Sequence, residues 1–216
     1  MITEPRVEEY VERLSTPHDP LLSELDAETR ATQTSPGMLT GPVAGRFLEL
    51  LVWSARPQRV LEIGTYTGHS ALSMAAALPD GGRVDACELD PERGAFAQRW
   101  FDRSAVGGRI TLHVGPALET IARLDGEFDF VFVDADKGGY VDYYEATLPR
   151  LSERGLIIAD NTLRDGRIVD LAPDEDPIAR FNEHVAADPR TVQVIVPIRD
   201  GMTLIRRAAA RSQALS

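Results

Sequence analysis

Short apolar runs alternate with longer stretches of mixed polarity through most of the chain. The runs are rich in Val, Ile, Leu and Phe, which favours strands, and they occupy residues 59–64, 83–89, 109–114, 128–133 and 155–160. Helices are predicted between them, from Gly68 to Leu78, after Asp90 and Pro91, from Pro116, and through Tyr143 and Leu148. Strands and helices that alternate in this way are typical of parallel βαβ units, whose sheet is covered on both faces.

Both ends of the chain depart from this alternation. Residues 41–55 predict a helix, with apolar positions at helical spacing at Val43, Phe47, Leu50 and Leu51, and with Ser54 at the same spacing. Residues 15–42 are rich in Pro, Thr and Ser, so residues 1–42 are expected to form N-terminal helices and a cap segment over a site. Residues 192–208 predict two strands joined near Asp200 and Gly201, a pair that favours the positive dihedral angles of a tight hairpin. The last strand should therefore enter the sheet antiparallel.

Composition and charge limit the possible functions. A chain of 216 residues with 43% hydrophobic and 26% charged residues suits one soluble α/β domain, here residues 1–216. The N-terminus lacks a secretory signal and every apolar run is shorter than the roughly 18 residues of a membrane span, so we expect a cytoplasmic protein without membrane contact. A net charge of −11 would repel a phosphate backbone, which disfavours nucleic acid as a partner. The single cysteine, Cys87, excludes an internal disulfide and is expected to be buried and inert.

The first predicted strand leads into a glycine loop, VLEIGTYTGHS at residues 60–70. Gly64 and Gly68 suit a close approach of the backbone to a ligand, but the G-x-x-x-G spacing lacks the G-x-G-x-x-G pattern of a dinucleotide site. Glu88 ends the second strand, where a carboxylate can either accept hydrogen bonds from both ribose hydroxyls or simply be solvated. Glu62 lies inside an apolar strand and needs a cationic or donating partner, such as an amino-acid ammonium. Together these residues indicate a nucleoside that carries an amino acid.

A second group of polar residues closes the fourth and fifth predicted strands. Asp134 follows the fourth strand, and Asp160 and Asn161 follow the fifth. If the two strands are neighbours, these side chains converge, and two like charges at one place require a counter-ion. Three hard oxygen ligands favour Mg²⁺, which leaves three octahedral positions for two adjacent substrate oxygens and a water molecule. The sequence therefore predicts a divalent cation that lowers the pKa of a substrate hydroxyl beside a second oxygen.

These motifs in combination resemble those of a known family. The chain has E-x-G-x-x-x-G-x-S from Glu62 to Ser70, an acid at the end of the second strand, DADK after the fourth strand and DN after the fifth. From about Thr34 to Arg206 it resembles the cation-dependent O-methyltransferases of the caffeoyl-CoA and catechol type. The resemblance implies a doubly wound, Rossmann-like, seven-stranded sheet with an antiparallel last strand, S-adenosylmethionine as cofactor, and a homodimer.

The resemblance also implies roles for individual residues. The methionine portion of the cofactor would be held by Thr40, Glu62, Gly64, Thr65, Ser70 and Asp136. Glu88 would hold the ribose, and the backbone at Ala117 the adenine. Lys137 would take the proton of the substrate hydroxyl, although a lysine that only pairs with Asp134 or Asp136 would leave the same pattern.

The chain departs from the family pattern in the region expected to contact substrate. Arg164 stands where family members often have tryptophan, and could pair with a carboxylate or phosphate of the substrate or be solvated. Asp165 falls at a substrate-contact position or in a turn, and Gly138 and Gly139 replace larger residues. The acceptor is therefore left open between a catechol and a hydroxy acid, free or carried on a thioester. A nicotinamide-dependent oxidoreductase, a noncatalytic binding module and an enzyme that methylates a hydroxylated tRNA base remain as alternatives.

Overall fold

The computed structural model describes residues 3–208, and within this range seven strands form one sheet in the order β3-β2-β1-β4-β5-β7-β6. The strands are β1 (Arg59–Ile63), β2 (Arg83–Glu88), β3 (Ile110–Val114), β4 (Phe128–Val133), β5 (Leu151–Asp160), β6 (Thr191–Val196) and β7 (Met202–Arg207). Strands β1 to β5 are parallel to one another, whereas β7 pairs antiparallel with both β5 and β6. The predicted fold class, including the antiparallel last strand, is confirmed.

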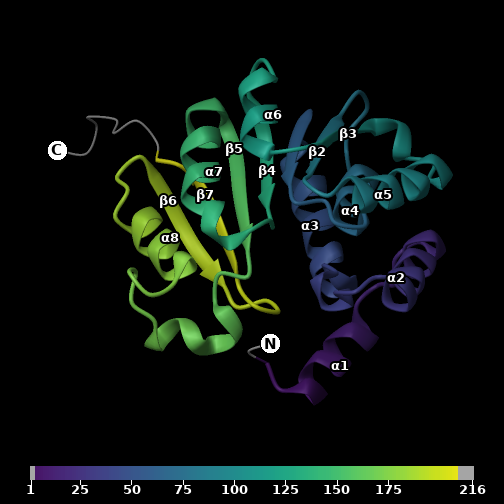
Figure 1. Ribbon diagram of the computed structural model, residues 1–216, viewed down its shortest axis with the longest axis horizontal. Coiled ribbons are helices and arrows are strands. Elements are labelled where there is room, and N and C mark those ends of the chain that lie inside the picture. Colours follow the sequence, from purple (N-terminus) through teal and green to yellow (C-terminus); the bar gives the residue numbers. More distant parts are fainter. Residues whose placement is uncertain (1–2, 209–216) are drawn as a thin grey trace.

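Helices cover both faces of the sheet (Figure 1). One face carries α3 (Gly41–Ala55), α4 (His69–Ala76) and α5 (Pro91–Arg103), and the other carries α6 (Ala117–Arg123), α7 (Tyr140–Thr147) and α8 (Pro177–Ala186). Side chains along the central strand β4 alternate between the two cores, because successive residues of a strand point to opposite faces. Phe130 and Phe132 pack with the first group of helices, and Val131 and Val133 with the second.

The N-terminal region adds two further helices and a cap segment. Here α1 (Pro5–Leu14) lies at the lower edge of the view, away from the sheet, and α2 (Pro20–Thr32) lies beside α3 and α4 (Figure 1). A 3₁₀ turn, η1 (Pro36–Met38), then leads into α3. The predicted helix over residues 41–55 is confirmed, but its buried positions are Gly41, Ala44, Gly45, Leu48 and Val52. The more obvious apolar stripe of this helix is partly exposed, with Leu50 57% exposed.

The connection between β6 and β7 differs in detail from the prediction. It spans residues 197–201, and the positive φ angles fall on Arg199 (51°) and Gly201 (84°) rather than on Asp200 and Gly201. Gly201 is required because a Cβ there would lie 2.4 Å from Cγ of Leu163. The tip of this hairpin is therefore packed tightly against the loop that follows β5.

The strand order reverses at β1, which lies between β2 and β4. At such a switch point the loops after neighbouring strands diverge and leave a crevice at the carboxyl edge of the sheet. The two central strands meet closely at this edge, since the Asp134 amide donates to the Ile63 carbonyl at 2.8 Å. Gly64 has φ 94°, and a Cβ there would lie 2.1 Å from the Asp134 carbonyl oxygen. Only glycine fits at the end of β1.

Among residues 3–208, no helix has the length and apolar character needed to cross a membrane.

Replacement of Gly64 by alanine tests this close approach. We expect Gly64→Ala to lower the free energy of unfolding by roughly 2–4 kcal/mol, because the new Cβ meets backbone atoms and the φ angle is strained. Gly108→Ala is the control, since Gly108 has open space around its Cβ position. Urea unfolding of both variants measures the difference, and equal stabilities would contradict the packing described for the end of β1.

Candidate functional site

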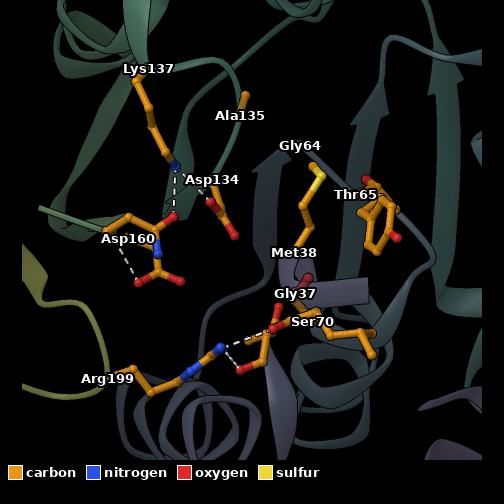
Figure 2. Close-up of a pocket in the computed structure, with 14 residues that line it drawn as sticks. Gly37, Met38, Gly64, Thr65, Ser70, Asp134, Ala135, Lys137, Asp160 and Arg199 are labelled. Carbon is orange, nitrogen blue, oxygen red and sulfur yellow. Dashed lines mark hydrogen bonds and ion pairs between the residues drawn. The ribbon is translucent and has the colours of Figure 1, made fainter. Parts of the chain in front are cut away.

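A pocket opens at the carboxyl edge of β1, β4 and β5 (Figure 2). Residues 37–40 of the cap segment form one part of its wall. The other parts are the glycine loop after β1, the loops after β4 and β5, and the tip of the β6–β7 hairpin. The predicted site residues among its lining are Thr40, Gly64, Thr65, Ser70, Asp134, Lys137, Asp160 and Asn161. The pocket thus brings together the predicted metal ligands, the predicted base and half of the predicted cofactor residues.

The predicted metal ligands meet around one cationic group. The ammonium of Lys137 donates to Oδ1 of Asp134 at 3.0 Å and to Oδ1 of Asn161 at 2.7 Å. Asp134 follows β4 and Asn161 follows β5, and the two strands are paired in parallel, so their carboxyl ends lie side by side. Two ligand oxygens from different strands therefore converge on a single point that a cation already occupies.

Asp160 adds a second negative charge to the same pocket. Its side chain is 2% exposed and its Oδ1 accepts from the Asn161 amide at 2.7 Å. Burial, followed by the nearby charge of Asp134, raises the pKa of Asp160. A bound cation would relieve both effects, and the three side chains offer the hard oxygen atoms that Mg²⁺ prefers. The donor set fits a divalent cation.

Within residues 3–208, no group of three or more His, Cys, Asp and Glu side chains is arranged to hold a metal ion. The trio of Asp134, Asp160 and Asn161 contains two carboxylates and one amide, so it is not a group of that kind.

Lys137 is the only lysine in the sequence, beside 22 arginines. Arginine is permanently charged, whereas a lysine can lose its proton and act as a base. The Lys137 ammonium also donates to the hydroxyl of Tyr140 at 2.6 Å, and that hydroxyl in turn donates to the Asp160 carbonyl at 3.0 Å. Tyr140 is 1% exposed, and burial raises its pKa, so it stays a neutral partner of the lysine. This tyrosine fixes the position of the lysine side chain.

Glu62 is fully buried beneath the glycine loop. Its Oε2 accepts from the Thr65 hydroxyl at 2.8 Å, while its Oε1 has no hydrogen-bond partner among the described residues. Burial raises the pKa of Glu62 to about 7. A buried carboxylate oxygen without a partner is costly unless a ligand donates to it. The arrangement suits a ligand ammonium, as the sequence predicted.

A neighbouring pocket contains three of the other four predicted cofactor residues, whereas Glu62 lines neither pocket. It is lined by Glu88 and Ala117 together with Asp136, and it shares Gly64 and Asp134 with the first pocket. Glu88 is 6% exposed, and its two oxygens accept from the amides of Tyr66 (2.7 Å) and Asp90 (3.0 Å). These bonds hold the carboxylate in place at the end of β2.

Asp136 lies on the Glu88 side of Asp134 and not among the residues that line the first pocket. It accepts from the Tyr143 hydroxyl at 2.5 Å and from the Gly139 amide at 3.0 Å. Cys87 is 2% exposed in the same region, and burial raises its pKa to about 12, in line with the predicted inert thiol.

The predicted substrate residues lie outside both pockets. Arg164 pairs with Oδ2 of Asp176 through Nε and Nη2, both at 3.0 Å. Asp165 follows it in η5 (Arg164–Asp170), where its backbone amide donates to Oδ1 of Asp200. A substrate role for either residue therefore depends on how the acceptor extends beyond the pocket.

Backbone strain concentrates around the site. Within residues 3–208, six residues other than glycine have positive φ, and five of these lie in loops at or beside the two pockets: Tyr66, Asn161, Arg164, Asp165 and Arg199. Such conformations cost energy and persist where surrounding contacts fix them, most often at functional sites.

Sequence reasoning missed three side chains that shape the site. Tyr140 and Tyr143 are buried in the core, but their hydroxyls also contact Lys137 and Asp136. Arg199 lines the first pocket although it is far along the chain from every motif. Neither spacing nor composition marks such residues, because their role depends on which loops the fold brings together.

Comparisons with known proteins identify the family of the chain. A family model described as O-methyltransferase matches residues 12–208. The chain is 36% identical over 179 residues to a protein named probable caffeoyl-CoA O-methyltransferase 2 from Dictyostelium discoideum, covering 79% of this chain and 78% of the relative. It is 37% identical over 182 residues to a catechol O-methyltransferase of Niastella koreensis, covering 78% and 82%.

A solved structure of a methyltransferase from Podospora anserina, bound to SAH, superposes with a TM-score of 0.87 at 30% identity, over 94% of each chain. The family match includes all seven strands and all the motifs quoted above, so the resemblance noted in the sequence is confirmed. The chain belongs to the O-methyltransferase family and is an O-methyltransferase.

Proposed function

We propose that the protein transfers a methyl group from S-adenosylmethionine to a hydroxyl of a small molecule, with the help of a divalent cation, Mg²⁺ being the expected ion. The acceptor carries a second oxygen beside the reacting hydroxyl, as in a catechol or a hydroxy acid, free or as a thioester. The observation that carries the proposal is the convergence of Asp134 and Asn161 on the Lys137 ammonium, beside the buried carboxylate of Asp160.

The cofactor would span the two pockets. Glu62, with its unpartnered Oε1, would accept from the ammonium of the methionine portion, beside Thr40, Thr65 and Ser70. Asp136 is proposed for the same portion of the cofactor. S-adenosylmethionine supplies the methyl group as a sulfonium, so the protein has only to bind it, orient it and exclude water.

Glu88 would hold the ribose, and the backbone at Ala117 the adenine, in the neighbouring pocket. Gly64 lies on the wall shared by the two pockets, where the backbone can approach the ligand closely. Two adjoining pockets with carboxylates in each suit a nucleoside joined to an amino acid.

The cation would be held by Asp134, Asp160 and Asn161. When bound, it lowers the pKa of the acceptor hydroxyl and orients the two acceptor oxygens. Lys137 takes the hydroxyl proton on Nζ as the acceptor oxygen bonds to the methyl carbon and the sulfur–methyl bond breaks. Tyr140 holds Nζ at the required place through its 2.6 Å contact.

The acceptor beyond its two oxygens would extend toward the loop after β5. Arg164 and Asp165 are proposed to contact that part of the acceptor, with the Asp176 pair fixing the arginine in place. The net charge of −11 supports a small molecule over nucleic acid as partner. We propose a cytoplasmic enzyme on the sequence grounds given above.

We also propose a homodimer, because apolar side chains are exposed on α1 and α3. Tyr10 and Leu14 are 56% and 59% exposed, and Leu50 and Trp53 are 57% and 67% exposed. Large apolar side chains that are exposed on the surface are often covered in a protein interface.

Removal of the divalent cation tests the proposed function most broadly. Methyl transfer is measured with catechols, hydroxy acids and their thioesters, with added Mg²⁺ and with EDTA. We expect EDTA to abolish turnover and to leave SAH affinity largely intact, because the cofactor contacts come from other residues. Full turnover in EDTA with a good acceptor would exclude the metal mechanism.

Substitution of Lys137 tests the proposed base. Lys137→Ala should lower kcat by about 10²–10⁴-fold, the usual contribution of a general base, with little change in SAH affinity. Lys137→Arg keeps the positive charge but cannot accept a proton near neutral pH, so it should be equally impaired. Restored turnover in Lys137→Arg would mean that the side chain acts only as a structural counter-ion.

Oligomeric state tests the proposed dimer. Light scattering after gel filtration should give twice the chain mass for the wild type and a lower mass for Trp53→Asp, because the charge would be buried at the interface. Val169→Asp is the matched control, since Val169 is 83% exposed but lies in η5, away from α1 and α3. A monomeric wild type at assay concentration would exclude the dimer.

A further inference from the structure

The tip of the β6–β7 hairpin is bonded to the loop that carries a proposed metal ligand. The carbonyl of Asp200 accepts from the Leu163 amide at 2.8 Å, and the carbonyl of Gly201 accepts from the Thr162 amide at 3.1 Å. Both donors follow Asn161 directly in the chain. Backbone hydrogen bonds therefore join the hairpin tip to residues 161–163, which we call the metal loop, on one side of the pocket.

The same tip reaches the opposite wall through Arg199. Its Nη1 donates to the carbonyls of Leu39, at 2.9 Å, and of Thr40. Figure 2 shows the arginine extending below Asp160 toward the cap segment, which carries Gly37 and Met38 into the pocket. Four consecutive cap residues, 37–40, line this pocket beside the glycine loop (Figure 2). Arg199 thus holds the wall that faces the proposed methionine site.

Few other polar contacts fix the cap segment. Within residues 3–208, residues 35–42 are bonded to other parts of the chain by three side chains: the Tyr66 hydroxyl to the Ser35 carbonyl, the His18 ring to the Pro42 carbonyl, and Arg199. Of these only Arg199 comes from the C-terminal half. Among the described residues, Arg199 is the polar link between the cap segment and the side of the pocket that carries the proposed metal ligands.

The backbone at Arg199 indicates that this contact has a cost. Its φ is 51°, in the left-handed region that side chains rarely adopt and that glycine adopts freely. A glycine at this position would relieve the strain, so an arginine is retained there against the local backbone preference. The two carbonyl bonds of the guanidinium supply a physical reason.

We propose that Arg199 is a positioning residue. Its hydrogen bonds hold the cap segment in place relative to the metal loop and so preorganise the cofactor site. Loss of the guanidinium leaves residues 36–40 without their anchor on the hairpin. Cofactor binding must then also order this wall, and its apparent affinity falls by the fraction of molecules in which the wall is in place. The inference rests on the cofactor site described under the proposed function.

Arg199→Gly removes the guanidinium and relieves the strained φ angle together, so a loss of SAH affinity cannot come from added backbone strain. The matched control is Arg56→Gly. Arg56 has φ 52° at the C-cap of α3, is exposed, and lies in neither pocket of the proposed site. Calorimetric titration of SAH and hydrogen exchange of residues 35–42 are measured in wild type and both variants.

If residues 36–40 are in place in about one Arg199→Gly molecule in ten, SAH Kd rises about tenfold. Exchange in residues 35–42 should rise in the same variant, while Arg56→Gly matches the wild type in both measurements. Equal SAH affinity and equal hydrogen exchange of residues 35–42 in all three proteins would overturn the positioning role of Arg199. A wild type that does not bind SAH would instead overturn the proposed cofactor site, which keeps the two failures distinct.

Discussion

The site is organised by the meeting of negative charge at the ends of two neighbouring parallel strands. Asp134 follows β4 directly and Asp160 is the last residue of β5, and the parallel pairing of these strands places both carboxylates at one edge of the sheet. Such charge requires a counter-ion, and the Lys137 ammonium lies there, bonded to Asp134 and Asn161. The proposed base and the proposed cation therefore belong to one electrostatic arrangement, in which the lysine is held close to where a substrate hydroxyl would lose its proton.

The remaining loops at the same edge follow from the strand order. Because β1 lies between β2 and β4, the glycine loop, Glu88 and the DADK turn reach the same crevice. Gly64 allows the ends of β1 and β4 to touch, which joins the proposed cofactor and metal pockets along one wall. The hairpin tip completes the far side, since its backbone bonds the metal loop and Arg199 bonds the cap. The chemistry of the O-methyltransferase thus depends on loops that only the completed sheet brings together.

Much of this arrangement could be predicted from the sequence. Alternating apolar runs gave the strands and the fold class, and the motifs at strand ends gave most of the residues that line the pockets, since parallel strands end at one edge. The remainder depended on tertiary contacts. Tyr140 could not be separated from core packing by its spacing, and Arg199 has no motif because its partners are backbone carbonyls about 160 residues earlier. The positive φ at Arg199 is not predictable either, because Asp200 and Gly201 are by themselves a sufficient pair for a tight turn.

The most direct measurement of the central claim uses the single lysine of the chain. Protein labelled with ¹³C at lysine Cε gives one lysine side-chain signal, and that signal belongs to Lys137. The account predicts that Mg²⁺ shifts it, as a cation enters among Asp134, Asp160 and Asn161, and that Asn161→Ala weakens the response. A lysine signal that stays unchanged at saturating Mg²⁺, in a protein that binds SAH, would contradict a cation site at these three side chains.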